Sequence, residues 1–366
     1  MPDHPITDEA ALKETIDRLK NAPRLALDTE FMRERTYFAE LALVQLADHD
    51  SIHLIDPLAQ LPAALLGSLF NSPSQTKVLH AARQDIEVLL PLTDTPLAPV
   101  LDTQIAAGLV GYAPQIGYGD LVRQELGVVL EKTQSRTDWT RRPLSAAQLD
   151  YAADDVRWLL PLAARLDAKL DSLGRSHWLQ EDLANLSDPK LYRVDPKDAW
   201  QRLKGSESLP IPEQQRLRQL SAWRETRAAQ RNLPRGWVMT DDVLRLIARS
   251  PPRDLNTLQA LDAMPSASAQ TLCDELLDTL ALATQWPLEG VVPRIDLKPS
   301  AAERARANAL TECVRQHATR LAMAPEVLAT SRDLKRLARG DALEQVLNGW
   351  RLQTLETDLR TCLTAH

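Results

Sequence analysis

The sequence predicts an α/β domain with a mixed β-sheet and flanking helices, followed by two small all-α domains. The first observation behind this prediction is a run of strand-like segments separated by turn-sized gaps, at 24–31, 41–47 and 51–56. The second is that later strand-like segments alternate with helical patterns, at 76–82 and 99–102. The third is that strand signals nearly vanish from about residue 195 onward, where amphipathic helical segments follow one another.

The elements follow from these spacings in order along the chain. The opening segment MPDHPITDEAALKETIDRLK is polar and acidic and is typical of a helix. Because the first three strands are close in sequence, we expect an antiparallel meander, whereas strands separated by helices are expected to pair in parallel. A long helical pattern from about Ser145 to Leu173 then closes the α/β domain.

Proline-containing joints divide the helical part of the chain. The joints SLPIPEQ and RSPPRDL separate amphipathic segments, and WPLEGVVPRIDLKPS falls near 286–300. We therefore expect domain boundaries at 1–194, 195–290 and 291–366. The segments TDDVLRLIARSPPRDLNTL and APEVLATSRDLKRLARGD resemble each other loosely, which leaves open whether the two helical domains are repeats.

Composition excludes several classes of protein. The 366 residues are 44% apolar, and no apolar run approaches the ~18 residues of a membrane span or resembles a signal peptide. The three cysteines are far apart and form no CxxC or Cys/His cluster, so we expect inert thiols in a reducing cytoplasm.

Residues 1–194 hold 19 basic and 28 acidic side chains, a net charge of −9, whereas 291–366 hold 12 basic and 9 acidic ones, a net charge of +3. Clustered acid suits a cation site, although a solvated acidic surface is the commoner cause.

The first strand, RLALDTEF, carries two acidic residues on one face. Side chains alternate along a strand, so Asp28 and Glu30 point the same way with their Cβ atoms about 7 Å apart. Two like charges this close repel each other and lose hydration at the edge of a core. The pair therefore requires a compensating partner.

Two further segments supply acidic groups. In VLHAARQDIEVLL, Asp85 lies where a strand is followed by a helix. The alternative to a role in a site is that Asp85 only caps the N-terminus of this helix. In QLDYAADDVRWLL, Tyr151 and Asp155 are four residues apart and share a helix face, from which Asp154 is rotated by about 100°. The alternative is that the acidic side chains of this helix simply form a stripe exposed to solvent. The ordered set of motifs favours a site, since four carboxylates without a cation would oppose folding.

The ligand chemistry indicates hard divalent cations. All candidate ligands are oxygens and no Cys or His accompanies them, which suits Mg²⁺ or Mn²⁺. Two such ions would neutralise Asp28, Glu30, Asp85 and Asp155 and form a clamp for phosphoryl transfer. We expect Asp28 to bridge the ions and the Tyr151 hydroxyl to orient the attacking water. Spacing and composition alone therefore predict a two-metal phosphodiesterase.

These motifs, in this order, resemble the DEDD 3′→5′ exonuclease superfamily, in its subclass with a tyrosine in the third motif. The segments LALDTEFMRERTYFAELALVQLAD, VLHAARQDIEVL and SRTDWTRRPLSAAQLDYAADDVRWL are similar to the ribonuclease D family. The resemblance continues through AWQRLKGSESLP and the arginine-rich helix that follows, which look like the linker and HRDC domain of that family. A second, more diverged HRDC-like domain would occupy about 295–366.

The resemblance implies a ribonuclease H-like fold and a metal-dependent hydrolase that removes nucleotides singly from RNA 3′ ends, releasing nucleoside 5′-monophosphates. It implies catalytic roles for Asp28, Glu30, Asp85, Tyr151 and Asp155, and RNA substrates such as tRNA precursors with short 3′ extensions. We expect no obligate protein partner and a cytoplasmic location. A DNA exonuclease of the same superfamily is the alternative within enzymes. A non-catalytic RNA-binding protein on a decayed nuclease fold is disfavoured by the complete set of carboxylates, and a calcium-stabilised structural protein by the lack of an EF-hand-like loop.

Residues next to the motifs are candidates for holding RNA. Those near the expected metal site are Thr29, Phe31, Met32, His80, Gln84, Arg136 and Trp139. Of these, Phe31 is explained equally well, and His80 better, as part of the core. In the helical part, a basic segment flanked by tryptophans is typical of polyanion binding, and its arginines are Arg216, Arg218, Arg224, Arg227, Arg231 and Arg235. The alternative there is an ordinary solvated helix surface.

Overall fold

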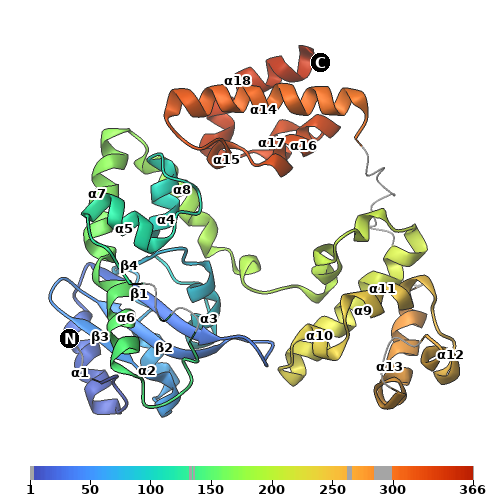
Figure 1. The fold of residues 1–366 in the computed structure, drawn as a ribbon, viewed down its shortest axis with the longest axis horizontal. Helices are drawn as coiled ribbons and strands as arrows, with labels where there is room; N and C mark the ends of the chain where they lie inside the picture. The colour runs from blue at the N-terminus through green and yellow to red at the C-terminus, as the bar shows by residue number, and fades with distance from the viewer. Residues whose placement is uncertain (1–3, 132–133, 135–136, 262–265, 284–298, 366) are drawn as a thin grey trace. The chain divides into compact units, whose positions relative to one another are not determined.

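The computed structural model of this chain describes all residues except 1–3, 132–133, 135–136, 262–265, 284–298 and 366 (Figure 1). The chain divides into two compact units. One comprises Met1–Met32, Leu41–Tyr192 and Pro299–His366, and the other comprises Arg33–Glu40 and Arg193–Lys298. Among the described residues, no helix combines the length and the apolar character that crossing a membrane requires.

A five-stranded mixed sheet forms the centre of the first unit, in the order β3-β2-β1-β4-β5. Strands β2 and β3 pair antiparallel, whereas β4 pairs in parallel with both β1 and β5. This topology confirms the predicted mixed sheet. The strands are β1 (Arg24–Met32), β2 (Glu40–Ala47), β3 (Ile52–Ile55), β4 (Thr76–Leu79) and β5 (Val100–Asp102).

Strand β4 is shorter than the sequence predicts. We expected it to run over 76–82, but it ends at Leu79. The chain then turns at Ala81, whose φ of +59° is incompatible with an extended strand. Helix α3 begins two residues later, so the turn places the first residues of α3 at the carboxyl end of the parallel strands.

Helices α6 (Ala146–Arg157) and α7 (Leu159–Ser172) cover one face of the sheet, against which they bury an apolar stripe. The register places Ala26 beside Val78 and Val78 beside Leu101, and this face packs against an apolar stripe of α6 and α7 that includes Val156. The predicted helix over 145–173 is in fact two helices, interrupted at Trp158. The helices of this part are α1 (Glu9–Leu19), α2 (Ala63–Ser68), α3 (Arg83–Thr93), α4 (Thr103–Leu109), α5 (Tyr118–Leu126), α6 (Ala146–Arg157), α7 (Leu159–Ser172) and α8 (Ser176–Ala184). Short 3₁₀ turns are η1 (Pro57–Ala59), η2 (Asn185–Ser187) and η3 (Pro189–Leu191).

The second unit has its own small core. The apolar face of α9, which includes Leu217 and Leu220, packs on Leu244 and Ile247 of α11. The connection 33–40 between β1 and β2 belongs to this unit: the side-chain oxygen of Asn232 accepts the backbone N–H groups of Tyr37 (3.1 Å) and Phe38 (3.0 Å). Its elements are η4 (Pro196–Arg202), η5 (Ser206–Ser208), α9 (Ile211–Arg231), α10 (Arg235–Val238), α11 (Asp241–Arg249), α12 (Leu255–Gln259) and α13 (Ser266–Ala283).

Residues 299–366 repeat the helix pattern of the second unit. Helices α9 and α14 both have 21 residues, and α11 and α16 both have nine. The start of α9 at Ile211 and of α14 at Ala301 are 90 positions apart, and so are the starts of α11 and α16. These matching lengths favour the repeat that the sequence left open. The C-terminal helices are α14 (Ala301–Leu321), α15 (Pro325–Leu328), α16 (Ser331–Arg339), α17 (Leu343–Val346) and α18 (Gly349–Ala365).

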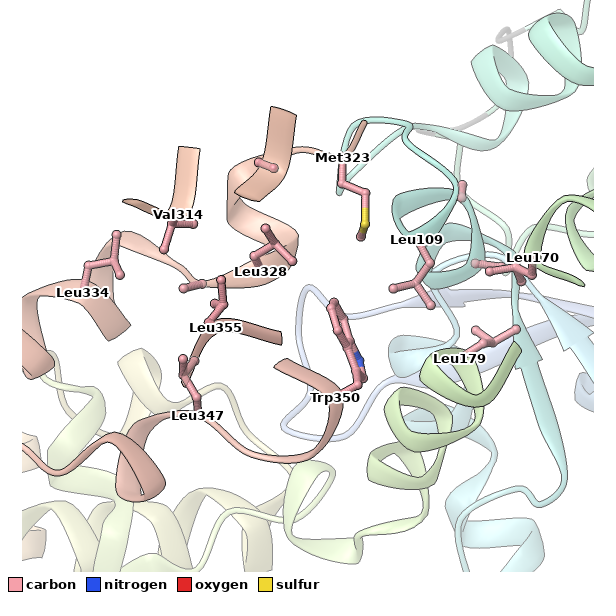
Figure 2. Close-up of a cluster of buried hydrophobic side chains, with 14 of the residues drawn as sticks. Leu109, Leu170, Leu179, Val314, Met323, Leu328, Leu334, Leu347, Trp350 and Leu355 are labelled. Atoms are coloured by element: carbon pink, nitrogen blue, oxygen red, sulfur yellow. The ribbon is translucent and has the colours of Figure 1, made fainter. Parts of the chain in front are cut away.

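The C-terminal helices share one hydrophobic core with the α/β part. Figure 2 shows Trp350 of α18 between leucines of the C-terminal helices and Leu109 and Leu179 of the α/β part. The Trp350 ring stacks on Trp178 with centroids 4.3 Å apart, and its indole N–H donates to Asp182 at 3.1 Å. This core fixes the C-terminal helices to the side of α4, α7 and α8.

Candidate active site

Two acidic residues lie on the face of β1 that α6 covers. Because side chains alternate along the strand, Leu27 and Thr29 point to the opposite face, where they are buried. Asp28 and Glu30 follow Ala26 on the α6 face, and both are only partly buried. Since β1 is the third of the five strands, the pair lies near the middle of the sheet, toward the carboxyl ends of the parallel strands.

Helix α6 brings a third carboxylate to this pair. One carboxylate oxygen from each of Asp28, Glu30 and Asp155 lies within 4.8 Å of the other two. Asp85, in the first turn of α3, is not part of this close group, and its Oδ1 accepts a hydrogen bond from the Thr29 hydroxyl at 2.5 Å. The structure therefore gathers three of the four predicted acidic residues tightly and places the fourth beside β1.

Close approach and loss of water raise the pKa values of these carboxylates. Burial raises the pKa of Asp28 well above its usual range, and the charges of Asp85, Asp155 and Glu30 raise it further. Burial, followed by the charges of Asp155 and Asp85, raises the pKa of Glu30 to about 9. Burial is also the main cause that raises the pKa of Asp155 to about 8 and of Asp85 to about 7. Without cations the group therefore holds protons at neutral pH, which is the state that a bound divalent ion would replace.

Tyr151 lies one helical turn before Asp155 on α6. Its ring contacts Trp139 with centroids 6.1 Å apart. Burial, and then the charges of Asp155, Glu30 and Asp28, raise the pKa of the Tyr151 hydroxyl far above its usual value. The phenol is therefore protonated at any physiological pH and is available as a hydrogen-bond donor beside the carboxylates.

The start of α6 is fixed by its cap and by an ion pair. Ser145 and Gln148 form a capping box, with the Ser145 hydroxyl accepting the Gln148 N–H. Arg142, just upstream, contacts both oxygens of buried Asp56 at 2.5 and 2.7 Å. Asp154 pairs with Arg157 at 2.8 Å, as expected for a residue rotated away from the site.

The residues near the site that were candidates for holding RNA differ in how exposed they are to solvent. Trp139 is 2% exposed and packs in the core with Ala152, which corrects the expectation that it holds RNA. The His80 Nε2–H donates to the Ile116 carbonyl (2.9 Å) and Nδ1 lies 2.9 Å from the Thr103 hydroxyl, so its structural role is favoured. Burial lowers the His80 pKa, which keeps the ring neutral. The other candidates are Thr29, which is buried, Phe31 and Met32, which are partly exposed, Gln84, which is exposed, and Arg136, which lies outside the described residues.

Most arginines of the predicted basic patch have partners inside the second unit. Arg224 is 5% exposed and donates to the Met239 carbonyl (2.9 Å) and to Asp241 (2.7 Å), so we correct the expectation that it contacts RNA. The other positions are Arg216, bonded to the Ala248 carbonyl, Arg218, over the Trp200 ring, Arg227, paired with Glu275, Arg235, paired with Glu225, and Arg231, which is exposed. The accessible positive charge is smaller than the sequence indicates.

Tyr118 is a residue near the site that the sequence did not suggest. Its hydroxyl donates to the Asp154 carbonyl (3.1 Å) and accepts the Trp158 N–H (3.3 Å) at the junction of α6 and α7. Burial, and then the charge of Asp155, raises the Tyr118 pKa well above its usual value. No local pattern could have revealed it, because its partners lie some 36 to 40 residues away.

Comparison with known proteins identifies two family models in the chain. A model described as 3′-5′ exonuclease matches residues 4–171, the part that carries all four carboxylates and Tyr151. The HRDC domain model matches residues 213–280, within the second unit.

Curated relatives match nearly the whole chain. Ribonuclease D of Acidiphilium cryptum is 37% identical over 359 residues, which cover 95% of this chain and 90% of that protein. Ribonuclease D of Xanthomonas oryzae pv. oryzae is 36% identical over 357 residues, covering 96% and 97%. The crystal structure of Escherichia coli RNase D, described as an exoribonuclease involved in structured RNA processing, matches with a TM-score of 0.88 at 30% identity and covers all of both chains.

Proposed function

The chain belongs to the ribonuclease D family and is a 3′→5′ exoribonuclease of RNA processing, and we propose that Asp28, Glu30, Asp85 and Asp155 form its active site by binding two divalent cations. The observation that carries this proposal is the approach of three carboxylates from β1 and α6 to within 4.8 Å of one another. An all-oxygen donor set fits Mg²⁺ or Mn²⁺. The raised pKa values of these groups support the same conclusion, because they mark acids that are close to one another and have no cationic partner among the described residues.

Each residue has a separate task in this proposal. Asp28 is the central ligand, since it borders the other three carboxylates, and Glu30 and Asp155 complete the close group. Thr29 holds the Asp85 side chain through its hydroxyl. Two divalent ions held by these carboxylates would supply Lewis-acid chemistry for phosphodiester hydrolysis. Tyr151 donates a hydrogen bond that orients the attacking water, which its protonated state permits.

The substrate in this proposal is RNA with a free 3′ end, from which nucleoside 5′-monophosphates are released one at a time. tRNA precursors with short 3′ extensions are the expected class. We assign the three domains to 1–194, 195–290 and 291–366, and exposed Arg231 of α9 to auxiliary RNA contact. The enzyme is proposed to act in the cytoplasm without an obligate protein partner.

A time course on RNA labelled at its 5′ end and extended at its 3′ end tests the proposal. We expect a ladder that shortens stepwise with wild-type protein in MgCl₂ or MnCl₂, and no shortening in EDTA or with Asp28→Asn. A matched DNA oligonucleotide measures sugar preference, which depends on contacts to the 2′-OH. Internal cleavage, or undiminished activity of Asp28→Asn, would contradict the assignment.

A further inference from the structure

Asp102 is a buried acid outside the four carboxylates of the proposed site. It ends β5, is 3% exposed, and is the register partner of Leu79 at the end of β4. Its carboxylate accepts four backbone N–H groups, of which the start of its own helix α4 supplies two. The donors are the amides of Gln104 (2.8 Å), Ile105 (3.3 Å), Ala81 (3.1 Å) and Ala82 (2.8 Å).

The other two donors belong to the turn between β4 and α3. Ala81 has a φ of +59°, a left-handed conformation that is disfavoured for a residue with a Cβ atom. Ala82 is the N-cap of α3 and offers no side-chain cap, so Oδ2 of Asp102 serves as the acceptor for its N–H. One carboxylate therefore holds both residues of a turn that local sequence does not favour.

Asp85 follows this turn by three residues. The Asp85 side chain accepts a hydrogen bond from Thr29 and lies outside the close group of Asp28, Glu30 and Asp155. Because Asp85 is in the first turn of α3, the conformation of the preceding backbone turn affects its distance from that group. We propose that Asp102 is a positioning residue for the active site: it holds the β4–α3 turn in the conformation from which Asp85 reaches the cations. This inference rests on the metal-binding role proposed above for Asp85.

Asp102→Asn tests the inference with little change of shape. The amide replaces one acceptor oxygen by a donor that faces a backbone N–H, so at least one hydrogen bond to the turn or to α4 is lost. The full-length protein is titrated with MnCl₂ in the absence of RNA and binding is followed by calorimetry. We expect Mn²⁺ affinity to fall about tenfold, as for other groups that orient a metal ligand. The Mn²⁺ concentration that gives half-maximal RNA digestion should rise in parallel, and saturating Mn²⁺ should restore the rate.

Two other variants separate the possible causes. Asp182→Asn is the matched control, because Asp182 is also buried but bonds to Trp350 and Arg351 of α18; it should lower stability and leave Mn²⁺ affinity unchanged. Asp85→Asn should weaken Mn²⁺ binding. If it binds Mn²⁺ like wild type, the proposed metal role of Asp85 fails. If Asp85→Asn weakens binding and Asp102→Asn does not, only the positioning role is overturned.

A rescue variant keeps the test decisive if Asp102→Asn folds poorly. Ala81 is exposed, and Ala81→Gly removes the Cβ penalty of its left-handed conformation without opening a cavity. The double variant Ala81→Gly/Asp102→Asn should therefore recover wild-type Mn²⁺ affinity. A folded double variant that still binds Mn²⁺ about tenfold more weakly would show that the turn is not what Asp102 holds.

Discussion

The carboxylates of the candidate site and the arginine-paired carboxylates of the helical parts have pKa values shifted in opposite directions. At the candidate site, burial and neighbouring acids raise the pKa of Glu30 to about 9 and of Asp155 to about 8. In the second unit, burial works to raise the pKa of Glu225, but hydrogen bonds from Arg235 and Tyr37 outweigh it, so the value is lowered. On α14, a hydrogen bond from Arg315 is the main cause that lowers the pKa of Glu312 to about 2.

The difference lies in where the positive charge comes from. Glu225 and Glu312 each have an arginine partner supplied by the fold. Within the described part of the chain, none of the ion pairs includes Asp28, Glu30, Asp85 or Asp155. Glu225 and Glu312 are therefore structural groups whose charge the fold already balances, whereas the four carboxylates of the candidate site are the ones that, in the proposed function, bind cations from solution. Four predictions test this contrast.

The largest expected effect is the loss of RNA digestion in Glu30→Gln. Glutamine keeps the shape of the side chain but removes a charged ligand, so we expect the rate of 3′ trimming to fall by about 10³-fold or more. The rate is measured on 5′-labelled RNA in saturating MgCl₂. Glu312→Gln is the matched control, and its rate should equal that of wild type. Equal activity of Glu30→Gln and wild type would place the cations elsewhere.

The same variant should make the metal-free protein more stable. At pH 8 the folded chain keeps a proton on Glu30 that the unfolded chain releases, and this costs free energy that glutamine does not incur. In EDTA, Glu30→Gln should therefore unfold at a higher temperature than wild type, as measured by circular dichroism. A lower unfolding temperature would mean that Glu30 already has a stabilising partner in the protein.

The stability of the metal-free protein should also fall as pH rises from about 5 to 9. Asp85, Asp155 and Glu30 have folded-state pKa values of about 7, 8 and 9, whereas the unfolded values lie near 4. The folded state binds more protons across this interval, so its stability is greatest at the acidic end and is lost as pH increases. Thermal unfolding in EDTA measures the slope, and MnCl₂ should raise the unfolding temperature most at high pH. A flat profile in EDTA would show that the carboxylates are not buried together at one site.

Features set by local spacing were predictable from the sequence, and features set by distant contacts were not. The alternation of Asp28 and Glu30 along β1 and the four-residue spacing of Tyr151 and Asp155 on α6 follow from strand and helix geometry, and both were predicted. The bond between Thr29 and Asp85 joins residues 56 positions apart, and nothing in either segment indicates it.

The basic patch shows the same limit in the helical part. A run of arginines is visible in the sequence, but the structure pairs Arg227 with Glu275, 48 positions away, and buries Arg224 against Asp241. Charge runs reveal how many arginines are present, whereas packing decides which of them remain accessible. The sequence indicates a repeat only loosely because α9 and α14 agree in length while most of their residues differ.

The smallest effect tests the helical side of the comparison. Glu225 is 2% exposed and bonds to both Tyr37 and Arg235, so Glu225→Gln leaves two partly buried donors without a charged acceptor. We expect the free energy of unfolding of the second unit to fall by about 1–3 kcal/mol. The fall is limited because Arg235 is partly exposed to water. Since the pKa of Glu225 is lowered in the folded state, its contribution is present above about pH 4.5 and is lost as pH falls, the reverse of the site carboxylates. Urea unfolding at pH 7 and pH 3.5 measures the difference between Glu225→Gln and wild type. If the difference in unfolding free energy between Glu225→Gln and wild type were the same at pH 3.5 as at pH 7, Glu225 would stabilise the unit through its shape and not its charge. Charge balance would then no longer explain the contrast between Glu225 and Glu30.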